Sequence, residues 1–206
     1  MAKAATGPFG TPGVTGSIGP VTFSQGQQGQ TVIKTKPVPS NPQSASQTGN
    51  RSMFAFISQQ WAGLSEAEQE TYDDAAAANS LQPFAQYAKD NNRRWQQSKA
   101  PSKARTAAET ETPAVPTITA NAGDSETPNT LEISVTATST DWGVAVYYKA
   151  DSAPAGARNQ CIAVRELAVG ANSIIVEHDG ELDGYYGVRV FTSDGVIGTI
   201  VSDQAE

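Results

Sequence analysis

Two neighbouring stretches, Leu131-Glu-Ile-Ser-Val-Thr-Ala137 and Gly143-Val-Ala-Val-Tyr-Tyr148, decide the fold of the second half of this chain. Apolar and polar residues alternate along the first stretch, and this is the period of a strand with one buried face. Gly, Asn, Asp and Pro separate these two stretches from five further runs of the same kind: 117–119, 161–164, 173–177, 186–191 and 197–201. Seven short strands in residues 113–206 predict an antiparallel β-sandwich.

The ends of this region resemble a known family of sandwiches. Pro113-Ala-Val-Pro116 and the pair Tyr185–Phe191 and Asp194–Gly198 are similar to the lead-in and last hairpin of fibronectin type III or immunoglobulin-like domains. The chain has one cysteine, Cys161, so the resemblance is to a disulfide-free version. It implies a binding or spacer module without enzymatic activity.

The charge of residues 113–206 limits what this region can bind. Four basic and 13 acidic residues give it a net charge of −9, which disfavours nucleic acid and anionic membranes. The densest acidic cluster, Asp179–Asp183, does not match the twelve-residue pattern of a calcium loop. We therefore predict no metal and no cofactor.

Residues 42–97 show helical spacing. Asn41-Pro42 is a cap and first-turn pair for one helix, Ser65 and Glu68 form a capping box for a second that runs to Ala78, and Pro83 can open a third. In the first helix, Met53, Ile57, Trp61 and Leu64 repeat at helical spacing, with Phe54 and Phe56 alongside. The expected helical core consists of Phe54, Ile57, Trp61, Leu64, Tyr72, Phe84, Tyr87 and Trp95.

Residues Trp61 to Ala76 resemble part of the HMG box, with its Trp, Leu-Ser, Glu, Tyr and Ala in order. This resemblance implies DNA bending. HMG boxes are strongly basic, whereas residues 42–97 carry four basic and six acidic residues. Because phosphate neutralisation dominates affinity for DNA, the charge argues against binding to nucleic acid.

Residues 98–112 are small and polar, and their composition predicts a flexible linker. The expected organisation of the chain is therefore α+β and multidomain. It consists of an anchoring arm (1–41), a helical segment (42–97), this linker, and the sandwich (113–206).

Residues 1–41 contain too few large apolar side chains to form a core of their own. Glycine recurs at every third position from Gly7 to Gly19, which indicates either collagen-like triplets or an extended arm in a groove of another protein. The runs 21–25 and 30–36 predict a hairpin whose open edges can join a neighbour's sheet. The expected assembly interface comprises Gly7, Gly10, Gly13, Gly16, Gly19, Phe23, Val32, Ile33, Lys34 and Lys36.

Catalysis is not expected. His178 is the only histidine, and neither it nor Cys161 lies in the sequence context of a nucleophile. No apolar stretch reaches the length of about 20 residues that a membrane span needs, and the N-terminus lacks the apolar centre of a secretory signal. We therefore expect the protein to be made and assembled in the cytoplasm of its host.

The two ends of the chain differ in charge. The first 65 residues hold four basic and no acidic residues, whereas the remainder holds 10 basic and 21 acidic residues. The order of arm, helices and immunoglobulin-like module resembles that of accessory structural proteins of tailed phages, such as head-decoration or tail-associated proteins. That resemblance implies a homo-oligomer in the virion, with capsid or tail proteins as partners and weak glycan contact through residues 113–206. A DNA-architectural protein and a carbohydrate-binding adhesin module are the alternatives.

Overall fold

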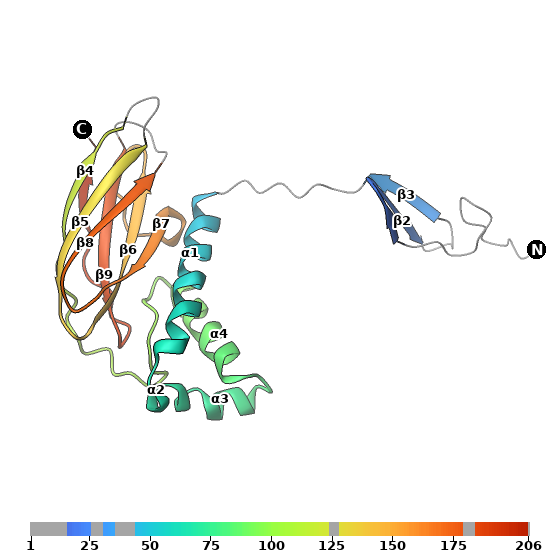
Figure 1. Ribbon diagram of the computed structural model, residues 1–206, viewed down its shortest axis with the longest axis horizontal. Helices are drawn as coiled ribbons and strands as arrows, with labels where there is room; N and C mark the ends of the chain where they lie inside the picture. Colours follow the sequence, from blue (N-terminus) through green and yellow to red (C-terminus); the bar gives the residue numbers. More distant parts are fainter. Residues whose placement is uncertain (1–15, 26–30, 36–43, 124–127, 179–183, 206) are drawn as a thin grey trace, which may run out of the picture. The chain divides into compact units, whose positions relative to one another are not determined.

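A computed structural model describes residues 16–25, 31–35, 44–123, 128–178 and 184–205 of the chain. The fold is of the α+β class, with helices and three antiparallel sheets (Figure 1). The chain divides into two compact units, Met1–Pro42 and Gln43–Glu206, which we call the arm and the body. The expected end of the arm at residue 41 lies next to this division.

The described strands of the body form two antiparallel sheets. Sheet I has the order β4-β5-β8, with β4 at Thr117–Asn121, β5 at Asn129–Ala137 and β8 at Gly170–His178. Sheet II has the order β10-β9-β6-β7, with β10 at Val201–Gln204, β9 at Tyr185–Thr192, β6 at Asp141–Lys149 and β7 at Cys161–Glu166.

The two sheets bury their facing sides in one core. Alternate residues of β5 are buried, as the sequence pattern predicts, and Leu131 and Ile133 are fully enclosed. They belong to the same apolar cluster as Val144 and Val146 of β6 and Val188 of β9. This burial removes the apolar face of each sheet from water, which is the main stabilising contribution to such a layer.

Six of the seven expected strands lie where the sequence predicts them. The seventh is displaced, because β10 begins at Val201 whereas a strand was expected over 197–201. Ile197 makes only an isolated bridge to Phe191, and Gly198 donates its N–H to the carbonyl of Val190. Ile197 and Ile200 also pack against the buried cluster beneath the helices. The apolar run 197–200 therefore contributes to the core just before β10 begins.

The helices begin and end near their predicted signals. They are α1 (Ala45–Gln60), α2 (Glu66–Glu70), α3 (Asp73–Ala78) and α4 (Pro83–Gln96), with a 3-10 turn η1 (Trp61–Gly63) after α1. The expected cap Asn41-Pro42 lies outside the described residues, and Ser44 occupies the N-cap of α1. Both halves of the Ser65 and Glu68 capping box are formed, and Pro83 opens α4. The second expected helix is interrupted at 71–72 and forms two short helices.

The helices cover the side of sheet II that faces away from sheet I. Met53, Phe56 and Ile57 of α1 share one buried cluster with Trp142 of β6 and Phe191 of β9. The Phe56 ring lies 5.0 Å from the Trp142 ring and 5.4 Å from the Phe191 ring, measured between centroids. Sheet II is therefore buried on both faces, and the body has three layers: sheet I, sheet II and helices (Figure 1).

A glycine lets α1 approach the sheet closely. A Cβ atom at Gly49 would lie 2.6 Å from the carbonyl oxygen of Cys161, a distance that side chains do not tolerate. One turn further along, the Ser52 hydroxyl accepts the N–H of Val164 at 2.8 Å. Because β7 is an edge strand of sheet II, α1 both covers that edge and satisfies part of its backbone.

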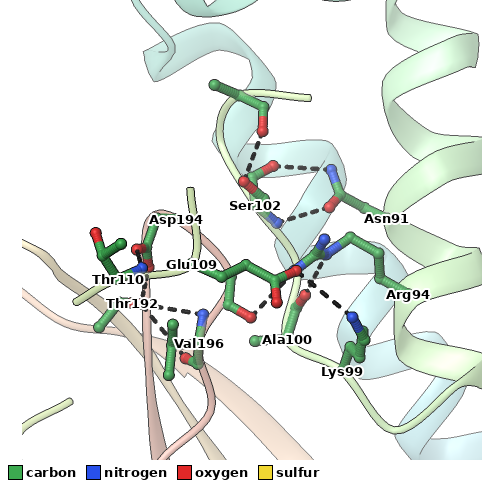
Figure 2. Close-up of polar contacts among 12 residues, drawn as sticks. Asn91, Arg94, Lys99, Ala100, Ser102, Glu109, Thr110, Thr192, Asp194 and Val196 are labelled. Carbon is green, nitrogen blue, oxygen red and sulfur yellow. Dashed lines mark hydrogen bonds and ion pairs between the residues drawn. The ribbon is translucent and has the colours of Figure 1, made fainter. Parts of the chain in front are cut away.

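The expected division of residues 42–206 into a helical segment, a flexible linker and a separate sandwich is wrong. Residues 98–112, which we call the strap, lie between α4 and the turn after β9 (Figure 2). Ala100 and Ser102 of the strap are buried. The strap is held mainly by hydrogen bonds to its backbone, which need no large side chains. Its small and polar composition therefore resembles that of a linker.

Candidate functional site

The arm contains a small antiparallel sheet, and most of the described interface residues lie on it. Its strands are β1 (Gly16–Ile18), β2 (Val21–Gln25) and β3 (Thr31–Thr35), in the order β1-β2-β3. The expected hairpin of residues 21–36 corresponds to β2 and β3, and β1 adds a third strand. Of the expected interface residues, Gly7, Gly10, Gly13 and Lys36 lie outside the described residues.

Two glycines of the collagen-like repeat lie in this sheet. Gly16 is paired with Phe23 in the register of β1 and β2, and it has a φ of 132°. Gly19 follows β1 in the turn to β2, with a φ of 55°. A collagen chain requires a φ near −75° at each residue. In residues 16–19, therefore, the repeat forms a strand and a turn, and the triple-helix interpretation does not hold there.

One face of the arm sheet is apolar. The register places Ile33 beside Phe23 and Ile18 beside Val21, and residues 21 and 23 share a face because side chains alternate along a strand. Phe23 is buried, but Ile18 and Ile33 remain 66% and 57% exposed. The other face is polar, with Ser17, Thr22 and Lys34 in one row and Val32 on the same side.

The arm sheet also ends in two edge strands, β1 and β3. An edge strand presents backbone N–H and C=O groups that can pair with another strand. Exposed isoleucines on one face and two edges within so small a sheet together make the arm the best candidate surface for assembly.

The expected helical core is only partly inside. Ile57, Leu64, Tyr72, Tyr87 and Trp95 are buried, and Trp61 is half-buried against the rings of Tyr72, Tyr87 and Phe84. Phe54 and Phe84 are 47% and 37% exposed, so their placement in the core is wrong.

The reason for this error is the direction of the sheet. Phe54 lies at helical spacing from Ile57 and Trp61, but the stripe that is buried with Trp142 and Phe191 of sheet II is the adjacent one, which carries Met53, Phe56 and Ile57. The sequence places both stripes on the helix, and it does not say which of them faces the strands. The Phe54 ring is consequently left on the surface of the helical layer. Phe84 lies in the first turn of α4, where its ring packs against that of Trp61 and stays partly exposed.

The strap is fastened to the helices on one side. Asn91 of α4 accepts the N–H of Ser102 at 2.7 Å and donates to its carbonyl at 3.1 Å. Arg94 donates from Nε to the carbonyl of Ala100 at 2.7 Å and forms an ion pair with Glu109 at 2.9 Å. Asn91 therefore mimics a paired strand for one residue of the strap (Figure 2).

On its other side the strap is fastened to the turn after β9. The Asp194 carboxylate accepts the N–H groups of Thr110 and Glu111 at 2.7 and 3.0 Å, and it also accepts the hydroxyl of Thr192 (Figure 2). Partial burial alone would raise the pKa of Asp194. The hydrogen bonds from Thr192, Glu111 and Thr110 outweigh that effect and hold the pKa below its usual value.

A cavity of about 310 Å³ lies between α4 and the strap. Polar side chains line most of it: Asp90, Arg93, Arg94, Gln97, Ser102 and Arg105. A second hollow of about 490 Å³ lies over sheet I. The hydroxyl side chains of Thr117, Ser134 and Ser173 stand in one row of that sheet, in register across β4, β5 and β8.

Neither candidate nucleophile is arranged for catalysis. The thiol of Cys161 is buried, and this burial raises its pKa to about 12, so it is protonated at neutral pH. The His178 ring packs 4.4 Å from the Tyr148 ring, and its Nδ1 lies 3.5 Å from the Tyr186 hydroxyl. The acidic cluster Asp179–Asp183 lies outside the described residues, and within the part of the chain that is described no group of acidic, His or Cys side chains could hold a metal.

No family model, no curated protein and no solved structure matches this chain. Among the described residues, none of the helices is long and apolar enough to cross a membrane.

Proposed function

We propose that this chain is a non-enzymatic structural protein of a virus particle, of the kind found in tailed phages, as a head-decoration or tail-associated protein. The arm grips the particle or a second copy of the chain, and the body is displayed. The observation that carries the proposal is the division of the chain into a compact body and a small arm sheet that keeps Ile18 and Ile33 exposed. Such apolar surface on so small a sheet is typical of a segment that is completed by a partner.

The displayed part includes an immunoglobulin-like or fibronectin type III-like sandwich. The strand order supports this assignment: β4, β5 and β8 form one sheet, and β10, β9, β6 and β7 form the other. In chain order these are strands one, two and five against seven, six, three and four, which is the arrangement of a fibronectin type III domain. The helices extend this module because they cover the outer side of sheet II.

The hollow over sheet I is the surface that we assign to weak contact with host glycans. Its row of Thr117, Ser134 and Ser173 offers hydroxyl groups that can donate and accept hydrogen bonds, as sugars require. With no aromatic ring lining the hollow, stacking on a sugar is missing, so the contact would be weak.

The test is incorporation into the particle of the phage that encodes the chain. We expect that removal of residues 1–41 abolishes incorporation, and that Ile18→Ser combined with Ile33→Ser reduces it at least tenfold. The matched control is Ser17→Ala combined with Thr22→Ala, which changes the polar face of the same sheet. Particles that still contain the truncated chain would refute the proposal.

A further inference from the structure

The strongest concentration of positive charge in this acidic protein lies on α4 and the strap. Of 14 basic residues in the chain, six fall between positions 89 and 105, where Asp90 is the only acidic residue. They are Lys89, Arg93, Arg94, Lys99, Lys103 and Arg105. Three of them, the arginines, line the cavity of about 310 Å³ between α4 and the strap.

Much of the donor capacity of these arginines is uncommitted. Arg105 uses Nε for its contact with Asp90 at 3.2 Å, and this leaves its two terminal nitrogens. Arg94 uses Nε and Nη2 for Ala100, Gly195 and Glu109, and this leaves Nη1. Within the described part of the chain, the Arg93 guanidinium has no hydrogen bond or ion pair.

The donors come from opposite walls. Arg93 and Arg94 line the cavity from α4 and Gln97 lines it from the C-cap of that helix, whereas Arg105 lines it from the strap. A planar carboxylate is satisfied by one guanidinium in a fork, but an anion with oxygens in several directions can accept from both walls at once. The Asp90 carboxylate also lies in the cavity, where it already accepts from Arg105 and from Gln86.

We infer that this cavity is a binding site for a tetrahedral oxyanion, such as a phosphate or sulfate group, free or carried by a small molecule. Arg93 is its principal ligand, and Arg105 and Gln97 complete it. Burial raises the pKa of Tyr72 to about 12, so this residue stays neutral and its hydroxyl donates to the Ser102 carbonyl at 3.1 Å. It therefore shapes the wall and adds no negative charge.

A compact anion fits better than a nucleic acid. The cavity volume is at the lower end of the range for small-molecule pockets, roughly 300 Å³. The body as a whole carries 11 basic and 21 acidic residues, and its net negative charge repels an extended polyanion.

The experiment is titration of the full chain with inorganic phosphate, sodium sulfate and sodium acetate at constant ionic strength, observed through the side-chain NMR signals of arginine Nε and glutamine amides. We expect saturable shifts with phosphate and sulfate, and much weaker ones with acetate. Because hydrogen bonds to charged groups are strong, Arg93→Gln should weaken binding about tenfold or more. Gln97→Glu, which adds a negative charge at an exposed position, should do the same.

The matched control is Lys89→Gln, which removes one positive charge from the same helix, one turn away and outside the cavity. It should change the affinity less than threefold. Equal losses in Lys89→Gln and Arg93→Gln would mean general charge attraction and would overturn the site. So would the absence of saturation with phosphate, or binding of a DNA duplex in its place. None of these results depends on incorporation into a particle.

Discussion

Substitution of Phe56 by alanine tests whether helices and strands form one cooperative unit. Phe56 is 4% exposed, and its ring lies between Trp142 of β6 and Phe191 of β9. Removal of a buried Phe ring costs about 3–5 kcal/mol, because the transfer free energy is lost and a cavity remains. Part of this cost is the loss of two tilted or edge-on ring pairs, each worth about 0.5–1.5 kcal/mol.

Phe54 supplies the control on the same helix. Phe54 is 47% exposed and lies outside the buried cluster on sheet II, so Phe54→Ala should cost less than about 1 kcal/mol. The two variants remove the same atoms from positions two residues apart. A difference between them therefore reports burial against the sheet and not the helix propensity of the new residue.

The assay is urea denaturation of the full chain, followed by far-UV circular dichroism and by tryptophan fluorescence. With a urea m value of about 2 kcal/mol/M, a loss of about 4 kcal/mol lowers the midpoint of Phe56→Ala by roughly 2 M. We expect the two probes to give coincident curves in each protein, since one core joins the layers.

Two results would refute this reasoning. Equal midpoints for Phe54→Ala and Phe56→Ala would mean that α1 does not pack on sheet II as described. A helical transition that shifts while the strand transition stays in place would mean that the helices and the sheets fold independently.

Three further perturbations probe the contacts that hold the body together. Gly49→Val should cost about 1–3 kcal/mol in thermal or urea unfolding, because the new side chain meets the carbonyl oxygen of Cys161 and forces α1 away from β7. The same displacement should speed alkylation of the Cys161 thiol. Asn91→Ala should cost about 1–3 kcal/mol and make the strap sensitive to limited proteolysis, because the buried N–H of Ser102 loses its acceptor and the Ser102 C=O keeps only the Tyr72 hydroxyl; unchanged proteolysis would contradict the two-way bond. The lowered pKa of Asp194 gives stability that is fully present above the unfolded-state pKa of this residue and is lost as the pH falls through its folded-state pKa. In Asp194→Asn, the slope of the unfolding free energy against pH should therefore flatten in that acidic range. An identical slope would contradict the assignment.

Signals that act over a few residues were readable in the sequence. Ser65 and Glu68 form their capping box because the two partners lie three positions apart, and Pro83 opens α4 because its fixed φ suits the first turn. The alternation along β5 likewise predicted a strand with one buried face. Each of these features depends on backbone geometry that the local chain specifies.

The contact between helices and strands was not predicted, although the sequence contains a signal for it. Residues 144–147 of β6 are all apolar, and a strand that is apolar on both sides is covered on both sides. A solvated sandwich would show alternation there, as β5 does. The strap gave no such signal, since its burial depends on a hydrogen-bonding partner in α4 that composition does not reveal.

This packing decides which part of the chain is left to make an interface. The helices cannot detach to grip a partner, because doing so would expose Trp142 and Phe191 of sheet II to water. The arm has no such commitment within its own unit, Met1–Pro42, whose length is close to the roughly 40 residues below which an independent fold usually needs outside support. A sheet of that size with Ile18 and Ile33 exposed gains more from docking than the body does. We therefore propose that the arm, and not the body, is the part that docks, because the apolar surface of the body is already used within its own core.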